Sequence, residues 1–264
     1  MNLLGKYIKY KLKSKGKHQI HSPFVFDFIT KCLKIKKNDS LKSQEKQLKS
    51  IYKKNHTSIE IADFGAGSKK LTNKRRISAI YKTATSKGIY ANLLFQLVSY
   101  YNCKNSLELG TSLGIGTFNL AKGNESCDIQ TIDACKNTQE IAKEKLNDFG
   151  IKNIKFINSE FDKAILSFEK EIKFDLIFID GHHDGMALKR YLNLLDDFSH
   201  DETIFILDDI RWSEGMFAAW NEITKDKKYN LTLDLFRMGL IWKRQHQAKE
   251  HFVIKIKGIL KGMI

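Results

Sequence analysis

A short apolar segment that ends in a glycine-rich turn constrains the fold of this chain most strongly. Residues 106–117 read SLELGTSLGIGT, with Glu108 inside the apolar segment and the turn beginning at Gly110. A strand that stops in such a turn presents backbone N–H groups and leaves room for a ligand against the main chain. The glycine spacing, G-x-x-x-G-x-G, differs from the dinucleotide pattern G-x-G-x-x-G. The turn therefore predicts a ligand without a pyrophosphate, and Glu108 suits a cationic group such as an ammonium; plain chain reversal is the alternative.

Three more apolar segments end in acids farther along the chain. They cover residues 130–133, 173–180 and 202–209, and helix-like segments at 138–149 and 186–198 lie between them. This alternation of strand and helix is typical of βαβ units. The apolar segments are nearly continuous, as parallel strands buried on both faces require. We therefore expect an α/β fold with a Rossmann-like, mostly parallel sheet and a ligand site at the carboxyl ends of its strands.

The C-terminal part predicts how this sheet ends. The expected elements are a helix at residues 214–225 and a strand pair at 231–236 and 239–243, with a tight connection at residues 237–238. Two strands with so short a connection are expected to pair with one another. A tail at 246–264 follows, and its alternating residues 253–257 either add a strand or pack as an appendage.

An extension with helical character precedes the core. Ser22 reads as a helix cap with Pro23 at the first helical position, and Phe24, Val25 and Phe28 supply an apolar face. This helix is expected either to dock as an ordinary helix or to form part of a substrate lid. A chain of 264 residues with 42% hydrophobic content suits one α/β domain with an extension. The predicted bounds are 1–82 for the basic extension and candidate lid, 83–245 for the core and 246–264 for the tail.

The net charge of +15 arises from 45 basic and 30 acidic residues. It is concentrated near the N-terminus, where lysines from Lys6 to Lys17 interleave with apolar residues. Such a stretch suits nucleic acid, an anionic membrane or an acidic substrate. Arginines and repeated stacking aromatics, which mark nucleic-acid recognition, are scarce in it. We therefore favour a solvated helix, with nucleic acid or membrane contact as the alternative.

Other features of the chain indicate its setting. The four cysteines show neither C-x-x-C spacing nor a dense disulfide pattern, which predicts reduced thiols and a cytoplasmic protein. The apolar runs reach only strand length and the N-terminus lacks a signal core, so no membrane span or targeting is expected. A second glycine-rich segment at residues 63–68 resembles a cofactor turn, but basic residues follow it. We expect a loop of the extension there, with a second cofactor site as the alternative.

Four motifs resemble class I S-adenosylmethionine-dependent methyltransferases, in particular the metal-dependent O-methyltransferases related to catechol O-methyltransferase. The motifs are Ser86-Lys87-Gly88, Glu108-Leu109-Gly110, Phe178-Ile179-Asp180-Gly181-His182-His183 and Leu207-Asp208-Asp209. They follow the order and spacing of the family over roughly residues 83–243. The resemblance implies an antiparallel last strand in the sheet and S-adenosylmethionine as the methyl donor.

The resemblance also implies which residues hold this donor. Glu108 and the turn would line its amino-acid end, and Asp133 would accept hydrogen bonds from the ribose hydroxyls; a solvated strand-end acid is the alternative for Asp133. Residues 158–162, which follow a further strand between the segments at 130–133 and 173–180, would lie near the adenine, although their local sequence departs from the family pattern. The implied cofactor-binding residues are Glu108, Gly110, Thr111, Ser112, Gly114, Asp133, Ala134, Glu160, Phe161 and Asp180.

Asp180, Asp208 and Asp209 predict a divalent metal site. Three carboxylates that converge from two strand ends repel one another unless a cation lies among them, and Mg²⁺ or a similar ion prefers oxygen ligands. Such an ion acidifies and positions a substrate hydroxyl. Related enzymes can carry an asparagine as the last ligand, for which Asp209 is an acceptable substitute. In the alternative interpretation, Asp208 or Asp209 caps the helix near Ser213 and Asp180 holds only a backbone turn.

His183 is the candidate general base, and Asp180 is the second candidate catalytic residue. Imidazole titrates near neutral pH, and His183 lies three residues past Asp180. By resemblance, catechol-type members use a lysine near this position, whereas D-G-x-H members imply the histidine. His182 and His183 alternatively pack within a loop. Arg211 and Trp212 are expected either to border the substrate or to pack at a helix start.

We therefore expect methyl transfer from S-adenosylmethionine to a hydroxyl of a small molecule, with a divalent metal and a histidine base. The alternatives are a metal-independent N- or O-methyltransferase, a nicotinamide-dependent dehydrogenase, and a non-catalytic polyanion-binding protein with a Rossmann-like fold. A dehydrogenase would need the pyrophosphate turn that this sequence lacks. The sequence leaves the acceptor and the oligomeric state open.

Overall fold

The structure, a computed structural model, describes residues 3–61, 74–83 and 88–256. The chain forms two compact units. The first unit combines Met1–Lys34 with Glu169–Ile264, and the second unit is Ile35–Phe168. Each unit holds one part of the predicted alternation of strands and helices, while the domain bounds expected at residues 82 and 245 stay a prediction.

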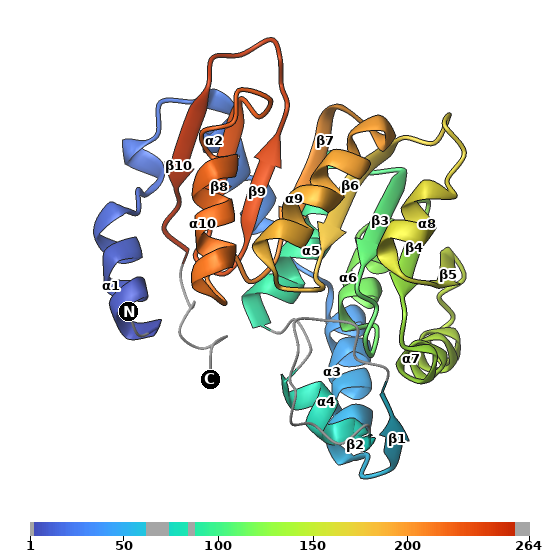
Figure 1. The fold of residues 1–264 in the computed structure, drawn as a ribbon. Coiled ribbons are helices and arrows are strands. Elements are labelled where there is room, and N and C mark those ends of the chain that lie inside the picture. The colour runs from blue at the N-terminus through green and yellow to red at the C-terminus, as the bar shows by residue number, and fades with distance from the viewer. Residues whose placement is uncertain (1–2, 62–73, 84–87, 257–264) are drawn as a thin grey trace. The chain divides into compact units, whose positions relative to one another are not determined.

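The second unit contains a parallel sheet with helices between its strands (Figure 1). Its elements here are α5 (Gly88–Tyr101), β3 (Asn105–Leu109), α6 (Ile115–Gly123), β4 (Asp128–Asp133), α7 (Lys136–Asp148), β5 (Ile154–Asn158) and α8 (Phe161–Leu166). The strands pair in the order β3-β4-β5, all in parallel. Leu107, Leu109 and Ile132 are fully buried, as expected for strands covered on both faces. The strand predicted at 130–133 and the helix predicted at 138–149 are confirmed as β4 and α7.

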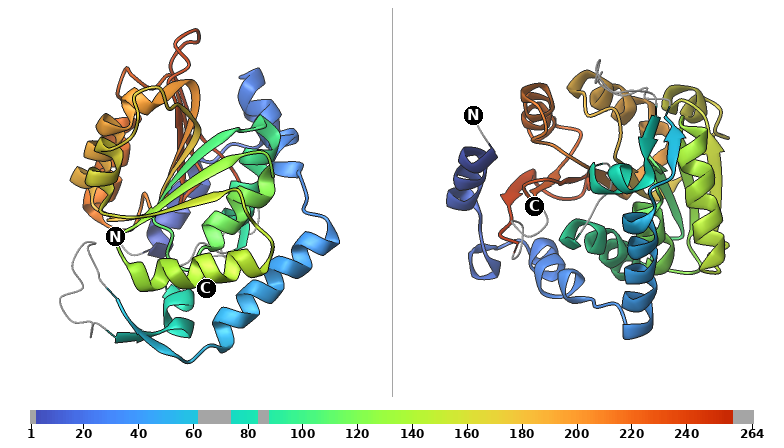
Figure 2. Two further views of the ribbon diagram at one scale, coloured as in Figure 1. Left: turned by 90° about the vertical axis from the view of Figure 1, so that its right-hand side faces the viewer. Right: turned by 90° about the horizontal axis from the view of Figure 1, so that it is seen from below.

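A helical segment and a short ribbon open the second unit. Its elements are α3 (Asp39–Lys54), β1 (Ser58–Glu60), β2 (Lys74–Arg76) and α4 (Ile77–Thr83). Asn38 caps α3, since its side chain accepts a hydrogen bond from the backbone N–H of Leu41 at 2.8 Å. β1 and β2 pair in antiparallel fashion, and α4 continues directly from β2 (Figure 2). The glycine-rich segment at 63–68, together with Ser86 and Lys87 of the first family motif, lies outside the described residues.

A buried ion pair joins the start of the second unit to its core. The Lys37 side chain is only 3% exposed, and its ammonium lies 2.7 Å from a Glu45 carboxylate oxygen and also donates to the side chain of Asn119. Burial lowers the pKa of Lys37 in spite of the attraction of Glu45. Lys49 pairs with the other Glu45 oxygen at 2.6 Å. This segment therefore depends on a single carboxylate that holds two cations.

We expect Glu45→Gln to lower the free energy of unfolding by about 3 kcal/mol, because it leaves the Lys37 ammonium buried without a counter-charge. The matched control is Asp27→Asn, which removes the exposed pair between Asp27 and Lys31 at 2.8 Å. That pair is worth no more than about 0.5 kcal/mol. Urea denaturation measures both changes. Equal small losses in the two variants would show that the buried pair does not hold the segment.

The first unit contains the remaining strands. Its elements are α1 (Leu3–Lys13), η1 (Lys17–Gln19), α2 (Pro23–Thr30), η2 (Cys32–Lys34), β6 (Phe174–Ile179), α9 (Gly185–Leu194), η3 (Asp196–Phe198), β7 (Ser199–Leu207), α10 (Glu214–Ile223), β8 (Leu231–Asp234), β9 (Gly239–Trp242) and β10 (Glu250–Val253). The strands predicted at 173–180 and 202–209 are confirmed as β6 and β7, which pair in parallel. The predicted helix at 214–225 is α10, capped by the Ser213 side chain.

The strand order in this unit is β10-β8-β9-β7-β6 (Figure 1). β9 runs antiparallel to both of its neighbours, β7 and β8, which confirms the expected reversed strand. The tail adds β10, which pairs in parallel with β8. This strand lies at residues 250–253 and shares only Val253 with the alternating segment 253–257 from which a strand was expected. The fold is therefore the expected α/β class, a Rossmann-like and mostly parallel arrangement with an N-terminal helical region.

α2 packs into the first unit as the sequence predicts. Pro23 occupies the first position, and Ser22 stands at the N-cap, although its side chain makes no capping hydrogen bond. Val25 and Phe28 are fully buried, and the Phe24 ring meets Trp242 of β9 edge-on at 5.5 Å between centroids. The Arg244 guanidinium lies 4.1 Å from the centroid of the same Phe24 ring. These contacts show a docked helix, and its role as a lid stays a prediction.

All four cysteines are buried and free of disulfides. None of the described helices is both long and apolar enough to span a bilayer.

Candidate active site

Glu108 lies fully buried inside β3 of the second unit. The hydroxyls of Thr117 and Thr131 both donate hydrogen bonds to its Oε2, the second at 2.6 Å. Burial raises the pKa of Glu108 to about 8, although the two hydroxyls oppose this shift. A carboxyl group of this kind gains a proton easily and becomes anionic when a cationic ligand group arrives.

Asp133 ends β4 beside the glycine-rich turn. Its Oδ2 accepts the backbone N–H of Ser112 at 2.8 Å, and its Oδ1 accepts that of Cys135 at 2.8 Å. Burial raises the pKa of Asp133, while these backbone donors favour the ionised form. The backbone N–H of Thr111 also favours the ionised form, and a carboxylate offers about four lone pairs in all. Asp133 is thus held in a fixed orientation by backbone donors, with acceptor capacity left for a ligand hydroxyl.

The turn between β3 and α6 has a left-handed backbone at several positions. Gly110 and Gly114 have φ of 109° and 73°, and Ser112 has φ of 47°. A Cβ atom on Gly114 would lie 3.0 Å from side-chain atoms of Ala142 and Leu146 on α7. Gly114 therefore lets the turn pack closely against α7, which adds a packing role to the expected one.

The other predicted cofactor residues lie around these strand ends. Thr111 is buried, and its hydroxyl shares a 2.7 Å hydrogen bond with Thr131, so it belongs to the network beneath the turn. Ala134 follows Asp133 and is half-buried. Glu160 occupies the N-cap position of α8 without a side-chain capping bond, and its carboxylate pairs with Lys163. Phe161 is buried in the first turn of α8.

The end of β5 is tied to the end of β4. The Asn158 amide donates to the backbone oxygen of Asp133 at 2.8 Å, and the backbone N–H of Ser159 donates to the same oxygen at 3.2 Å. The second unit thus brings its predicted cofactor residues to the carboxyl ends of three adjacent strands. In sheets of this kind, that edge is where ligands bind.

The acids of the first unit form a second cluster, with Arg237 as its cation. Arg237 Nε and Nη2 donate to the two oxygens of Asp208 at 2.9 Å and 2.6 Å, and Nε lies 3.0 Å from Oδ1 of Asp209. Asp180 follows β6 and shares a side-chain hydrogen bond with Asp208. The three acids therefore meet as predicted, and an arginine lies among them (Arg237, Asp180, Asp208 and Asp209).

The charges in this cluster shift one another's pKa values. Burial and then Asp208 raise the pKa of Asp180 well above its ordinary value, with Arg237 opposing. Burial and Asp208 likewise raise the pKa of Asp209 to about 7. Burial alone would lower the pKa of Arg237, but Asp208 and Asp209 outweigh it and raise that pKa. One guanidinium cannot balance three carboxylates, so the cluster retains a proton at neutral pH.

Sequence reasoning missed Arg237, which it placed in a tight connection. The register explains the position, because Gly239 at the start of β9 pairs with Leu207 at the end of β7. The connection from β8 to β9 must then lie at the carboxyl end of β7, beside Asp208. The predicted strand pair together with the implied reversed strand was the signal that could have found it.

His183 lies next to the acid cluster. Its Nε2 is 3.8 Å from Asp209 Oδ2 and 4.0 Å from Asp180 Oδ1. Burial lowers the pKa of His183, with Asp208 opposing the shift. His182 instead bonds through Nδ1 to the Tyr191 hydroxyl. Both histidines have positive φ values, 61° for His182 and 20° for His183, a backbone that costs energy in residues with a side chain.

Arg211 and Trp212 lie just past the acid pair and differ in their contacts and in their exposure to solvent. Arg211 forms a two-pronged pair with Asp234, at 2.8 Å and 2.5 Å, and its role is to hold β8. Trp212 is 69% exposed, and its ring lies 5.9 Å from that of His183. Of the two, Trp212 is the one placed to border a substrate.

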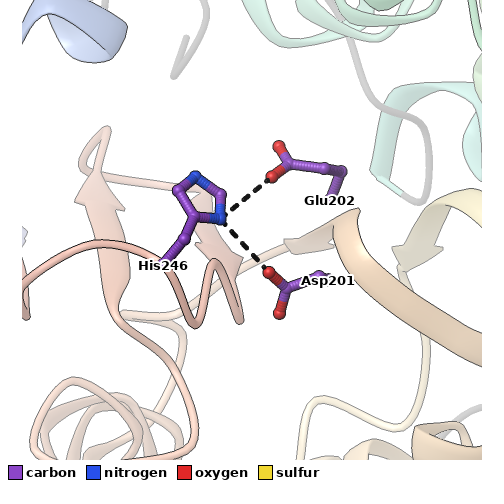
Figure 3. Close-up of side chains that lie close together, drawn as sticks. All are labelled: Asp201, Glu202 and His246. Atoms are coloured by element: carbon purple, nitrogen blue, oxygen red, sulfur yellow. Dashed lines mark hydrogen bonds and ion pairs between the residues drawn. The ribbon is translucent and has the colours of Figure 1, made fainter.

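Another group of ligand-type side chains lies at the opposite end of β7. Among the described residues, Asp201, Glu202 and His246 are the set of three whose donor atoms lie within 4.8 Å of one another (Figure 3). Arg244 pairs with Glu202 and also hydrogen-bonds Nε2 of His246 at 2.9 Å. Arg244 thus pairs with one of the two carboxylates and with the imidazole, so we interpret the group as an ion-pair cluster.

Part of the chain is similar to known methyltransferases. Residues 107–210 match the family model described as a methyltransferase domain. None of the curated proteins matches the sequence. The matched residues include Glu108, Asp133, His183 and both acids after β7, and they extend over both units.

Solved structures of methyltransferases share the fold. An SAH-bound methyltransferase of Podospora anserina is 15% identical with a TM-score of 0.58, covering 85% of this chain and 97% of its own. An O-methyltransferase of Bacillus cereus in complex with SAH is 16% identical with a TM-score of 0.54, covering 89% and 100%. The O-methyltransferase TomG of Streptomyces achromogenes, in complex with SAM, is 12% identical with a TM-score of 0.56, covering 83% and 94%.

Mostly parallel strands with one reversed strand define a Rossmann-like fold, which places ligands at the carboxyl ends of the strands. The family match adds that residues 107–210 resemble a methyltransferase domain. Residues 107–210 thus carry a methyltransferase domain, and the chain shares its fold with solved methyltransferases that bind S-adenosylmethionine or its product.

Proposed function

We propose that this protein transfers a methyl group from S-adenosylmethionine to a hydroxyl of a small molecule, with His183 as the general base. The observation that carries the proposal is Asp133, which is oriented by two backbone N–H groups and lies within the matched methyltransferase domain. Hydroxyl acceptors are favoured because the B. cereus and S. achromogenes neighbours are O-methyltransferases.

In this proposal the second unit holds the donor. Asp133 accepts hydrogen bonds from the two ribose hydroxyls through its remaining lone pairs. Glu108 supports the cationic amino-acid end, and the turn at Gly110 and Ser112 lets that end approach the main chain. The buried start of α8 at Phe161 gives the adenine an apolar neighbour.

His183 supplies the base in this proposal. His183 accepts the hydroxyl proton, the acceptor oxygen forms a bond to the methyl carbon, and the carbon–sulfur bond breaks to leave S-adenosylhomocysteine. The ionised acids of the neighbouring cluster, of which Asp209 lies 3.8 Å from His183 Nε2, stabilise the imidazolium that forms. Their role is thus to hold the proton on the imidazole during the transfer.

The side chains of the acid cluster do not fit the divalent metal expected at Asp180, Asp208 and Asp209. Asp208 gives both oxygens to Arg237, and Asp209 gives one oxygen to the same guanidinium. Mg²⁺ needs carboxylate lone pairs at about 2.1 Å, and a guanidinium on those oxygens repels a second cation. The metal stays a sequence-based prediction, and no step of the proposed reaction uses it. The proposal is therefore the metal-independent form of O-methyl transfer.

The two adjacent histidines provide the test of the base. With radiolabelled S-adenosylmethionine and a panel of phenols and alcohols, we expect His183→Asn to lower the rate constant by about 100-fold or more. His182→Asn is the matched control and should stay within a few-fold. Because burial lowers the pKa of His183, the wild-type rate should hold to below the ordinary histidine value of about 6.5, where His183 becomes protonated. Equal losses in both variants, or an unchanged acid limb in His183→Asn, would remove His183 from the reaction.

A further inference from the structure

α1 has two different faces, and one of them is exposed. On the inner face, Tyr10 is 3% exposed, and its ring and that of Tyr7 lie 5.2 Å and 5.4 Å from the ring of Phe236. On the outer face, Leu4, Ile8 and Leu12 are 63%, 51% and 82% exposed. Positions four residues apart lie above one another on a helix, so these three form one continuous aliphatic stripe.

The exposure of this stripe does not come from a loosely attached helix. The Tyr10 hydroxyl donates to the backbone oxygen of Ile254, and the Lys6 ammonium donates to that of Arg211 at 3.0 Å. The chain after the helix is also fixed, because Lys15 exchanges backbone hydrogen bonds with Val253 and Lys255 at 2.8 Å and 2.9 Å. α1 is thus docked by its aromatic face and presents its aliphatic face outward.

Positive charge surrounds the stripe. The sequence contains no acid before Asp27, and the exposed lysines of this segment are Lys9, Lys11, Lys13, Lys15 and Lys17. On a helical projection at 100° per residue, Lys11 and Lys9 lie on opposite sides of the stripe. α1 lies at the outer edge of the first unit, next to β10 (Figures 1 and 2).

We propose that α1 binds the surface of an anionic membrane, with Leu4, Ile8 and Leu12 among the acyl chains and the lysines at the lipid phosphates. A helix of this kind lies in the interface plane, held by its apolar stripe and by attraction to anionic lipids. Among the described residues, Leu4, Ile8 and Leu12 are the large exposed hydrophobics that share one helix, and a lysine stands at every second position from Lys9 to Lys17. The proposal does not depend on the reaction that the enzyme catalyses.

Two other occupants fit the face less well. Nucleic acid is bound through phosphate contacts and stacking rings, but Tyr7 and Tyr10 are turned inward and the outer residues are aliphatic. A second copy of α1 would bring two lysine-rich surfaces together, which like-charge repulsion opposes. An anionic bilayer satisfies both the aliphatic stripe and the charge.

Vesicle flotation of the full chain tests this proposal. Phosphatidylcholine vesicles with a phosphatidylglycerol fraction should carry the protein, pure phosphatidylcholine vesicles should not, and high salt should weaken the binding. Ile8→Ser with Leu12→Ser should reduce binding by about tenfold or more, as should Lys9→Glu with Lys11→Glu. Leu166→Ser with Met186→Ser is the control, since these side chains are each 72% exposed on other helices, and its binding should be unchanged.

The outcomes separate the three occupants. Failure of the wild type to float with anionic vesicles overturns the proposal. Full vesicle binding by the Ile8 and Leu12 double variant also overturns it, because charge alone would then account for the binding. Salt-sensitive binding to duplex DNA without vesicle binding would assign the face to nucleic acid, and a dimer that the same double variant abolishes would assign it to a second copy.

Discussion

Arg237→Met is expected to lower the free energy of unfolding at neutral pH by about 3 kcal/mol, because it leaves the buried Asp208 carboxylate without its cation. Arg237→Lys keeps the charge and loses the two-pronged geometry, so its loss should be about half as large. Urea denaturation across a pH series measures both.

The pH dependence of this loss has a definite sign. The pKa of Asp209 is about 7 in the folded chain, above the ordinary value of about 3.9, so the native state binds this proton more tightly than the unfolded state. Stability from this carboxyl is therefore lost as the pH rises from about 4 to about 7, and Arg237 limits the loss. The difference between Arg237→Met and the wild type should thus shrink toward pH 5 and be largest above pH 7. A difference that does not change with pH would contradict the charge arrangement.

Arg237→Met also tests whether the acid cluster can bind a divalent metal. Mn²⁺ titration followed by electron paramagnetic resonance should show no binding at the acid cluster of the wild type. Removal of the guanidinium frees oxygens of Asp208 and Asp209, so Arg237→Met should gain Mn²⁺ affinity. Stoichiometric binding to the wild type that Asp208→Asn abolishes would restore the divalent metal expected from the sequence.

Asp133→Asn is expected to weaken S-adenosylmethionine binding by about 100-fold, since two hydrogen bonds to a charged acceptor are worth a few kcal/mol together. Asp128→Asn is the matched control, because Asp128 is exposed at the opposite end of the same strand. Filter binding with the labelled cofactor measures the affinities, and thermal denaturation shows whether each variant folds. Equal affinity in the two variants would remove Asp133 from the cofactor site.

The fold was predictable from the sequence because each buried strand is a nearly continuous apolar run. The runs that became β4, β6 and β7 end within two residues of the expected acids, Asp133, Asp180 and Asp209. β10 could not be assigned with the same certainty, because residues 250–253 are short and carry a glutamate and a histidine. Its place beside β8 is set by long-range pairing that no local pattern reports.

The candidate site was predictable in part. The carboxylates converge because parallel strands bring their ends to one edge of a sheet. The sequence predicts a metal ion among these carboxylates. The cation that the structure shows there is Arg237, which lies in the connection between β8 and β9. The inward direction of Thr111 likewise depends on Thr131 and Gln139, which are distant in the sequence. Local patterns therefore located the acids and the turn, but not the partners that balance them.

Calorimetric titration of the full chain with S-adenosylhomocysteine, and separately with NAD, in the presence of EDTA tests the central claim most directly. We expect one S-adenosylhomocysteine molecule to bind per chain without added metal and NAD not to bind, because the turn at Gly110 lacks the pyrophosphate pattern. Binding of NAD in place of S-adenosylhomocysteine, or no binding of either, would contradict a methyl donor held at the carboxyl ends of β3 and β4.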